Sequence, residues 1–217
     1  KLLILHLLIT ILIILVLILK YKFSPVIALT LGSLYYGIAT GLGPVESAGL
    51  IASGFGNTMT GIGLVVGFGC IVGQLLADSG GIHAIVKAIL NKFPPHRTPE
   101  ALTAAGLVVS TPVFFDVAFV IMSPMAKALA KVANMPRVIM AIALYLGTGA
   151  AHMLIPPTPG PLAVAETLGV PLGQMILYGA LLAVPTSYIS LWLWKRIILR
   201  SNFWKPEEDE EEIDGEQ

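Results

Sequence analysis

Two short proline-bearing segments, Ser110–Asp116 and His152–Pro161, hold most of the residues of this chain that could do chemistry. The first contains Ser-Thr-Pro and then places Asp116 directly after two phenylalanines. The second follows His152 with the run Ile-Pro-Pro-Thr-Pro-Gly-Pro. Proline removes a backbone donor and disfavours helix at the residue before it. We therefore expect both segments to be unwound backbone within helical stretches.

Two titratable groups in these segments are candidates for moving a proton. A carboxylate at membrane depth costs at least ~2.5 kcal/mol to insert and holds a proton more readily than it does in water. We therefore interpret Asp116 as a proton-coupling residue, with a structural cap of a helix N-terminus as the alternative. His152 could relay a proton or donate to a carboxylate. A core histidine bonded to backbone is the alternative there.

The same segments offer groups that could bind an anion. A half-helix that starts just after each break directs free N–H groups and its positive dipole end at the break. Proline after Gly160 fits the start of such a half-helix, and three hydroxyl side chains lie in the breaks. The predicted substrate-binding residues are Ser110, Thr111, His152, Thr158 and Gly160.

The composition places these segments in a membrane. The 217 residues are 56% hydrophobic and only 12% charged, whereas soluble domains are roughly 45–50% apolar and about 25% charged. Too little polar surface remains to cover a water-soluble globule, which excludes a soluble enzyme, a disulfide-stapled secreted domain and a nucleic-acid binder. Because the chain lacks the spacing of a metal site, a nucleophile elbow or a P-loop, we expect no enzyme activity, no metal and no cofactor.

The net charge of zero conceals an acidic end. Eight of the thirteen acidic residues lie within residues 207–217, and such a run repels itself and has nothing to bury. We expect residues 1–200 to form a transmembrane domain and residues 201–217 to form an acidic, disordered, cytoplasmic tail or a linker.

Long apolar stretches predict the membrane spans. Residues 2–19 would cover roughly 27 Å at 1.5 Å per residue, close to the ~30 Å bilayer core, and are longer than the apolar region of a signal peptide. Further spans are predicted at residues 23–42, 60–77 and 172–194, with an interfacial helix at 45–55. Residues 138–152 and 161–168 are predicted to be two halves of one broken helix.

The stretch Ala101–Met122 is predicted to be a re-entrant hairpin. As a full crossing it would place Lys127, Lys131 and Arg137 outside the cell, against the positive-inside rule. As a hairpin it keeps twelve of the thirteen basic residues on the cytoplasmic side. A pair of broken segments is typical of the binding site of a secondary transporter. The predicted fold class is an all-α polytopic membrane protein with a re-entrant hairpin and a broken helix.

Residues 67–81, 112–120 and 152–161, in this order, resemble the gluconate permease (gluconate:proton symporter) family. The resemblance covers roughly residues 1–200 and only the N-terminal half of family members. It implies proton-coupled symport of gluconate or a related sugar-acid or hydroxy-acid anion across the inner membrane. It also implies one inverted-repeat half of an ion-transporter-type fold, whose partner is the missing C-terminal half or a second copy.

Two positions depart from the family pattern. The family often has Glu at the position of Asp116 and His at the position of Thr158, so the carboxylate here is one methylene shorter and one titratable group is absent. These changes bear on gluconate itself more than on the transport of an anion. The alternative function, from a different class, is a non-transporting membrane subunit derived from a half-transporter.

Overall fold

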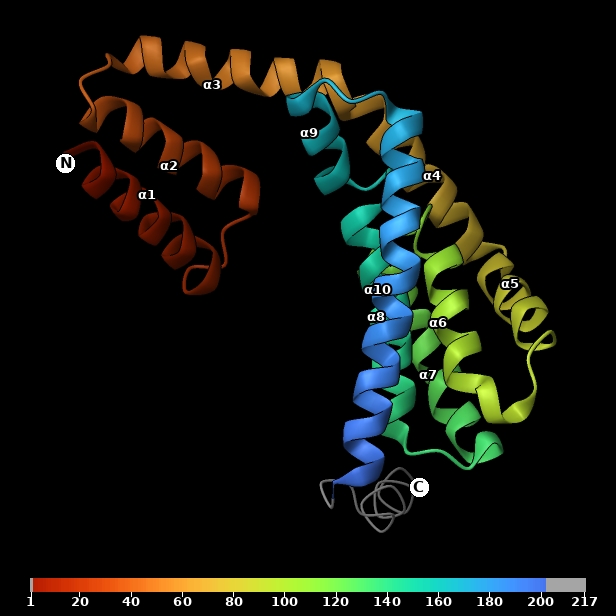
Figure 1. Ribbon diagram of the computed structural model, residues 1–217. Helices are drawn as coiled ribbons and strands as arrows, with labels where there is room; N and C mark the ends of the chain where they lie inside the picture. Colours follow the sequence, from red (N-terminus) through yellow and green to blue (C-terminus); the bar gives the residue numbers. More distant parts are fainter. Residues whose placement is uncertain (1, 202–217) are drawn as a thin grey trace. The chain divides into compact units, whose positions relative to one another are not determined.

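A computed structural model of the chain describes residues 2–201, and within this range every regular element is a helix (Figure 1). Apart from Ser201, the predicted acidic tail lies outside the described residues. Four helical stretches are long and apolar enough to cross a membrane: Leu2–Leu19, Pro44–Asp78, Arg137–Leu168 and Leu172–Arg200. The predicted class of all-α polytopic membrane protein is therefore confirmed.

The chain divides into two compact units, residues 1–61 and residues 62–217. The helices of the described range are α1 (Leu2–Leu19), α2 (Pro25–Ala39), α3 (Pro44–Thr58), α4 (Leu64–Asp78), α5 (Gly81–Leu90), α6 (Thr98–Val109), α7 (Phe115–Ala133), α8 (Arg137–Leu154), α9 (Pro159–Leu168) and α10 (Leu172–Arg200), with a π-turn at Met59–Gly63 and a 3-10 turn at Pro95–Arg97.

In the first unit, α1 and α2 pair through a small residue and a polar contact. Gly32 of α2 leaves room for the side chain of Ile14, because a Cβ at position 32 would collide with it. His6 and Tyr35 form a hydrogen bond of 3.3 Å between the two helices. Of the α1 residues only Thr10 is buried. The apolar surface of α1 is thus left exposed, as expected of a helix in lipid.

The predicted interfacial helix and the predicted span at 60–77 correspond to α3 and α4, which follow each other without a loop. The structure is helical from Pro44 to Asp78, with a single π-turn at Met59–Gly63 between α3 and α4. A one-turn π insertion keeps the backbone hydrogen-bonded through this stretch rather than ending the helix. Helix α3 covers the predicted residues 45–55 and runs on through the π-turn, and its interfacial position stays a prediction.

The core of the second unit is built around α6. Nine of its twelve residues are buried, and α8 approaches it closely where small residues meet. A Cβ added to Gly106 would lie 2.9 Å from the backbone nitrogen of Thr148, and the Thr103 hydroxyl donates to the Ala143 carbonyl at 3.0 Å. Small residues of this kind are what allow membrane helices to associate.

Helices α6 and α7 form a hairpin around the first break. Figure 1 shows α7 returning beside α6 after the break. The 12 residues of α6 span only about 18 Å, less than the ~30 Å of a bilayer core. The apolar start of α7 gives way to Lys127 within the same helix. The 19 residues of α7 span about 28 Å, so only α6 is clearly shorter than the bilayer core. Entry and exit of the pair on one side of the membrane stays a prediction.

Both breaks are shorter than predicted. The first covers residues 110–114, since Phe115 begins α7, and the second covers residues 155–158, between the end of α8 and the start of α9. Helix α9 begins at Pro159 and includes Pro161. Prolines are tolerated in a first helical turn because their missing N–H groups would be unpaired there. The half-helices are therefore longer than the predicted 138–152 and 161–168.

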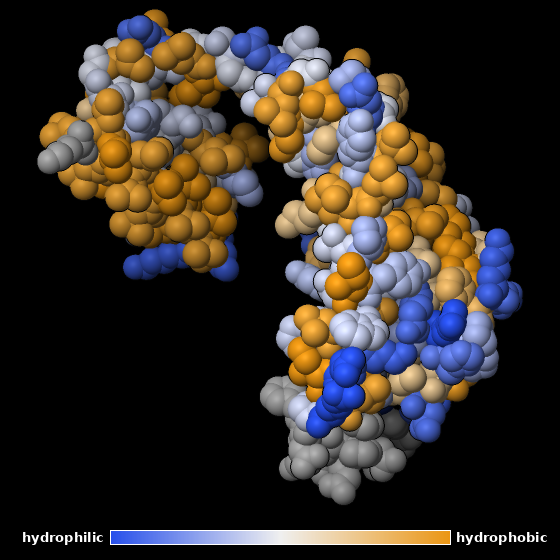
Figure 2. All heavy atoms as spheres, viewed as in Figure 1, coloured by the Kyte–Doolittle hydropathy of each residue, from blue (hydrophilic) through white to orange (hydrophobic). Residues whose placement is uncertain are grey.

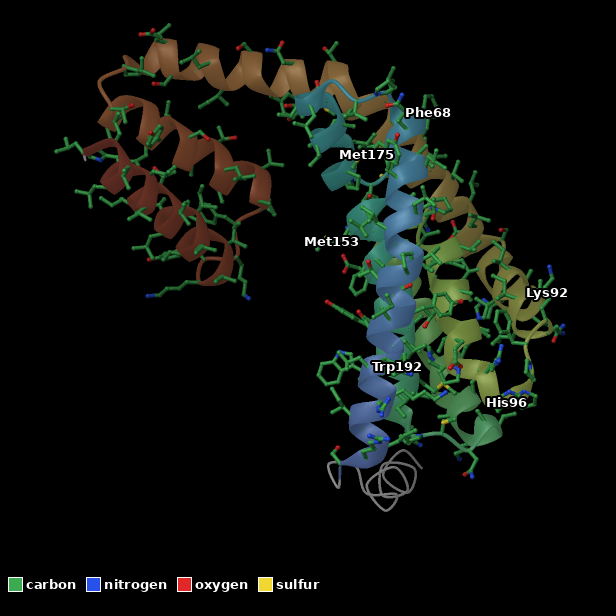
Figure 3. All side chains as sticks on the ribbon, viewed as in Figure 1. Phe68, Lys92, His96, Met153, Met175 and Trp192 are labelled. Carbon is green, nitrogen blue, oxygen red and sulfur yellow. The ribbon has the colours of Figure 1, made fainter. Side chains whose placement is uncertain are left out.

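Polar and apolar side chains are unevenly distributed along the second unit. Figure 3 shows Lys92, His96 and Trp192 toward one end and Phe68 and Met175 toward the other. Figure 2 shows hydrophobic residues along the sides of this unit, with hydrophilic residues gathered around α5 and the C-terminal end of α10. We call the end that carries Lys92 and His96 the basic end. Its composition is that of a membrane-flanking surface.

Candidate functional site: two helix breaks against one glycine-lined helix

Both breaks pack against the same face of α4. A Cβ at Gly73 would lie 2.8 Å from the carbonyl oxygen of Pro112, in the first break. A Cβ at Gly69, one turn earlier, would lie 3.1 Å from the ring of Pro157, in the second break. The cavity left between the breaks and α4 measures about 10 Å³, room for at most one water molecule. The structure therefore brings the two predicted segments together in a closed contact.

The predicted hydroxyl groups stabilise the breaks themselves. Ser110 donates to the Val113 carbonyl at 3.2 Å and Thr111 to the Leu107 carbonyl at 2.9 Å. The Thr158 hydroxyl lies near two carbonyls, those of His152 at 2.7 Å and Ile155 at 2.9 Å. Because the hydroxyl hydrogens point at backbone oxygens, these side chains offer a ligand only their lone pairs.

The helix that follows the first break has an uncapped N-terminus. Phe114 holds the N-cap position of α7 and makes no side-chain cap hydrogen bond. The first-turn N–H groups of Phe115, Asp116 and Val117 therefore remain available for an anion. The carboxylate of Asp116 lies in this first turn, where the helix dipole favours a negative charge.

Two expectations for Asp116 are thereby corrected. Phe114, rather than Asp116, holds the N-cap position, so the capping alternative is wrong. The side chain of Asp116 is exposed in this chain, so the described residues do not supply the apolar surroundings expected for it. A carboxylate on a helix that begins at a membrane break still needs a partner or a role.

The helix that follows the second break offers a single amide. Thr158 holds the N-cap position of α9 without capping it, and the first and third residues of that helix are prolines. Proline has no N–H to donate, so Gly160 alone supplies a first-turn amide. Gly160 is exposed in this chain.

His152 lines a cavity to which α4 contributes no residue. Its ring centroid is 6.0 Å from that of Phe114 and 6.3 Å from that of Phe115. Its Nδ1 atom is buried and has no hydrogen-bond partner among the described residues, although buried polar atoms are usually paired. The cavity measures about 380 Å³, within the range of small-molecule sites. Its lining comes from α7, α8 and α10 and includes Phe115, Tyr145, Gly149, His152, Thr186, Ser187 and Ser190.

Comparison with known proteins assigns the family. Residues 2–217 match the model of the GntP family permeases. The chain belongs to this family. The resemblance predicted from the three motif stretches is confirmed, and with four candidate spans this permease-family chain is a multi-pass membrane protein. No solved structure matches the chain.

Several characterised relatives are transporters of small organic acids. The chain is 31% identical to the high-affinity gluconate transporter of Escherichia coli K12 over 83% of this chain and 41% of that protein. It is 32% identical to the gluconate permease of Pseudomonas aeruginosa over 91% and 44%, respectively, and 33% identical to the D-serine transporter DsdX of Escherichia coli O6:H1 over 84% and 41%. The chain thus spans less than half the length of these relatives.

Sequence reasoning missed the polar lining contributed by α8 and α10. Tyr145 lies two helical turns before His152 and so shares its face of α8. Thr186, Ser187 and Ser190 are polar residues at helical spacing in an otherwise apolar span. Polar groups on one face of a membrane helix indicate a protein-facing or water-facing surface, and this signal could have identified them.

Proposed function

We propose that the protein is a proton-coupled secondary transporter, a symporter of gluconate or a related small sugar-acid or hydroxy-acid anion across the inner membrane, and not an enzyme. The chain would supply one inverted-repeat half of the transport pathway, with its basic end and acidic tail on the cytoplasmic side. The observation that carries the proposal is the meeting of two helix breaks on α4 in a member of a permease family. Broken helices at a shared position are the usual site of a secondary transporter.

The substrate anion would bind at the break region, approached from the cavity beside His152. The uncapped N-terminus of α7 supports this, because free N–H groups and the positive dipole end favour a carboxylate. The Gly160 amide and the unpaired Nδ1 atom of His152 would add donors. The lone pairs of Ser110, Thr111 and Thr158 would accept from substrate hydroxyls. The 10 Å³ contact at α4 would then be the closed side of the pathway.

Proton coupling would depend on Asp116, with His152 as the second group. The exposed carboxylate of Asp116 supports a partner that covers it, either the remaining half of a longer transporter or a second copy of the chain. Covering would exclude bulk water from the Asp116 carboxylate. Binding of the substrate anion and of the proton at neighbouring positions would then reinforce each other, since each offsets the charge of the other.

The substitution Asp116→Asn in the full-length transporter tests this proposal. We expect proton-driven accumulation of labelled gluconate in vesicles to be abolished, while exchange of gluconate down its own gradient persists, because asparagine keeps the shape but cannot lose a proton. Asp78→Asn is the matched control, since Asp78 accepts a hydrogen bond from Gln74 at the end of α4 and lies outside both breaks. Normal pH-dependent accumulation by the Asp116→Asn protein would refute its role in coupling.

Cysteine labelling tests the hairpin separately. In a background without Cys70, single cysteines at Asn91 and Asn134, both exposed, should react with an impermeant maleimide only from the cytoplasmic side. Asn91 follows α5 and Asn134 follows α7, so a re-entrant α6–α7 pair leaves them on one side. Labelling of position 134 from the outside would show a full crossing.

A further inference from the structure

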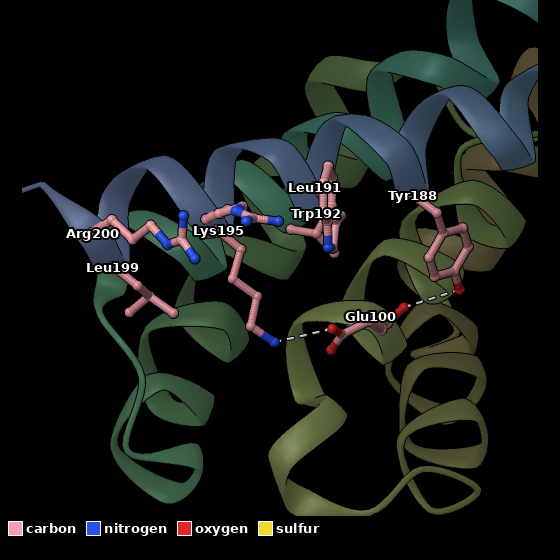
Figure 4. A pocket seen from close by; sticks show the side chains of 8 residues that line it. Glu100, Tyr188, Leu191, Trp192, Lys195, Leu199 and Arg200 are labelled. Atoms are coloured by element: carbon pink, nitrogen blue, oxygen red, sulfur yellow. Dashed lines mark hydrogen bonds and ion pairs between the residues drawn. The ribbon is translucent and has the colours of Figure 1, made fainter.

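A second cavity lies at the basic end, between α10 and the start of α6 (Figure 4). It measures about 540 Å³. It is separate from the site at the breaks and shares no lining residue with the cavity beside His152. Its lining consists of Glu100, Tyr188, Leu191, Trp192, Lys195, Arg196, Leu199 and Arg200.

The polar groups of this cavity leave an excess of positive charge. Lys195 pairs with the Oε1 atom of Glu100 at 3.0 Å, and the Tyr188 hydroxyl donates to the Glu100 backbone carbonyl at 3.1 Å. The Oε2 atom of Glu100 is buried and has no hydrogen-bond partner among the described residues, so the one carboxylate of the lining is paired through a single oxygen, with Lys195. Three cations against one carboxylate give the lining a net charge of +2. Arg196 and Arg200 are the cations left for a ligand, and both are exposed.

The same lining is apolar on one side and carries a residue typical of the membrane surface. Leu191 and Leu199 lie beside the cations. The guanidinium of Arg196 stacks over the ring of Trp192 at 5.3 Å, which holds it in place. Tryptophan concentrates where hydrocarbon meets head groups, and Figure 3 shows Trp192 toward the basic end of the second unit. The ligand that suits this site is therefore anionic at one end and apolar at the other.

We propose that this cavity binds the phosphate group of an anionic membrane phospholipid. Arg196 and Arg200 would contact the phosphate oxygens, because a guanidinium matches phosphate with paired N–H donors. Leu199 and the Trp192 ring would pack against the glycerol and upper acyl region. Basic pockets between membrane helices are sites of this kind.

Native mass spectrometry of the full-length protein in detergent tests the proposal. The protein should retain phosphatidylglycerol in preference to phosphatidylcholine. The double substitution Arg196→Gln/Arg200→Gln should lower that retention by about tenfold or more, because each basic residue adds to the affinity for an anionic head group. Lys195 is left unchanged, since its removal would strand the Glu100 carboxylate. The matched control, Lys87→Gln/Lys92→Gln, removes two exposed cations outside the cavity and should change retention by less than about twofold.

Three outcomes would overturn the proposal. Equal loss of phosphatidylglycerol in both double variants would indicate general charge attraction. Displacement of the lipid by millimolar inorganic phosphate would indicate a site for a free anion. Residues 207–212 are all acidic, and they can be changed together to glutamine and asparagine. If phosphatidylglycerol retention then rises more than about tenfold, this acidic segment is the occupant of the cavity. Because lipid retention is measured without transport, failure of the transport proposal leaves this test intact.

Discussion

The two breaks pack against the same helix, α4, but differ in the atoms that touch it and in the polar groups that they expose. The first touches Gly73 of α4 with a backbone carbonyl, whereas the second touches Gly69 with a proline ring. The first break is followed by α7, whose first turn has three backbone N–H groups and the carboxylate of Asp116. The second break is followed by α9, whose first turn has two prolines and therefore a single backbone N–H group. One break is thus rich in polar groups, and the other is defined mainly by shape.

From this difference we infer different roles for the two breaks. Free amides and a carboxylate respond to charge, so the first break suits binding an anion and exchanging a proton. Prolines restrict the backbone and remove donors, so the second break suits holding a fixed turn, with the single Thr158 hydroxyl hydrogen within reach of the carbonyls of His152 and Ile155. Substitutions that disturb one break without the other can test the division.

The largest effect on stability is expected from Gly73→Ala. The added Cβ would lie 2.8 Å from the Pro112 carbonyl oxygen and 3.3 Å from the Val113 Cα, and backbone cannot move aside as a side-chain tip can. Overpacking of this kind costs about 1–3 kcal/mol. A thermal melt of the purified protein should show a lower Tm, and gluconate uptake should fall with it.

Gly67→Ala is the matched control on the same helix, since a Cβ there meets nothing within 4 Å. It should leave stability unchanged or raise it by about 0.5–1 kcal/mol, the gain of alanine over glycine in a helix. If Gly73→Ala melts at the same temperature as Gly67→Ala, the close contact between α4 and the first break does not exist in the folded protein.

An intermediate effect is expected from Thr158→Val. The substitution keeps the shape of this buried side chain but removes the one hydroxyl hydrogen within reach of the His152 and Ile155 carbonyls, at about 1–2 kcal/mol. Thr158→Ser should restore most of the loss. Thr167→Val in α9, the helix that follows Thr158, removes an exposed hydroxyl that donates to the Ala163 carbonyl, so it should cost less than about 0.5 kcal/mol. Equal Tm changes for both valine variants would contradict a structural role for Thr158.

The sequence was sufficient to predict where the helices break but not what surrounds the breaks. Proline acts locally, so the runs around Pro112 and Pro157 revealed both interruptions. The contacts of Gly69 and Gly73 join segments more than thirty residues apart, and no local pattern specifies them. The exposure of Asp116 was missed for the same reason, because burial depends on which helices cover a residue. The end of the second break was misjudged because prolines that interrupt a helix are also accepted in its first turn, as Pro159 and Pro161 are in α9.

The smallest effect is expected from Gly69→Ala, which completes the series on α4. The added Cβ would lie 3.1 Å and 3.4 Å from two atoms of the Pro157 ring, so the ring must yield by a few tenths of an ångström. That cost is offset by the gain of alanine over glycine in a helix, about 0.5–1 kcal/mol. The net change in unfolding free energy should lie within about 0.5 kcal/mol of zero, against the clear loss for Gly73→Ala. A Tm for Gly69→Ala as low as that for Gly73→Ala would show that the proline ring is held as rigidly as the backbone of the first break. The two breaks would then be mechanically equivalent, and only their polar groups would distinguish them.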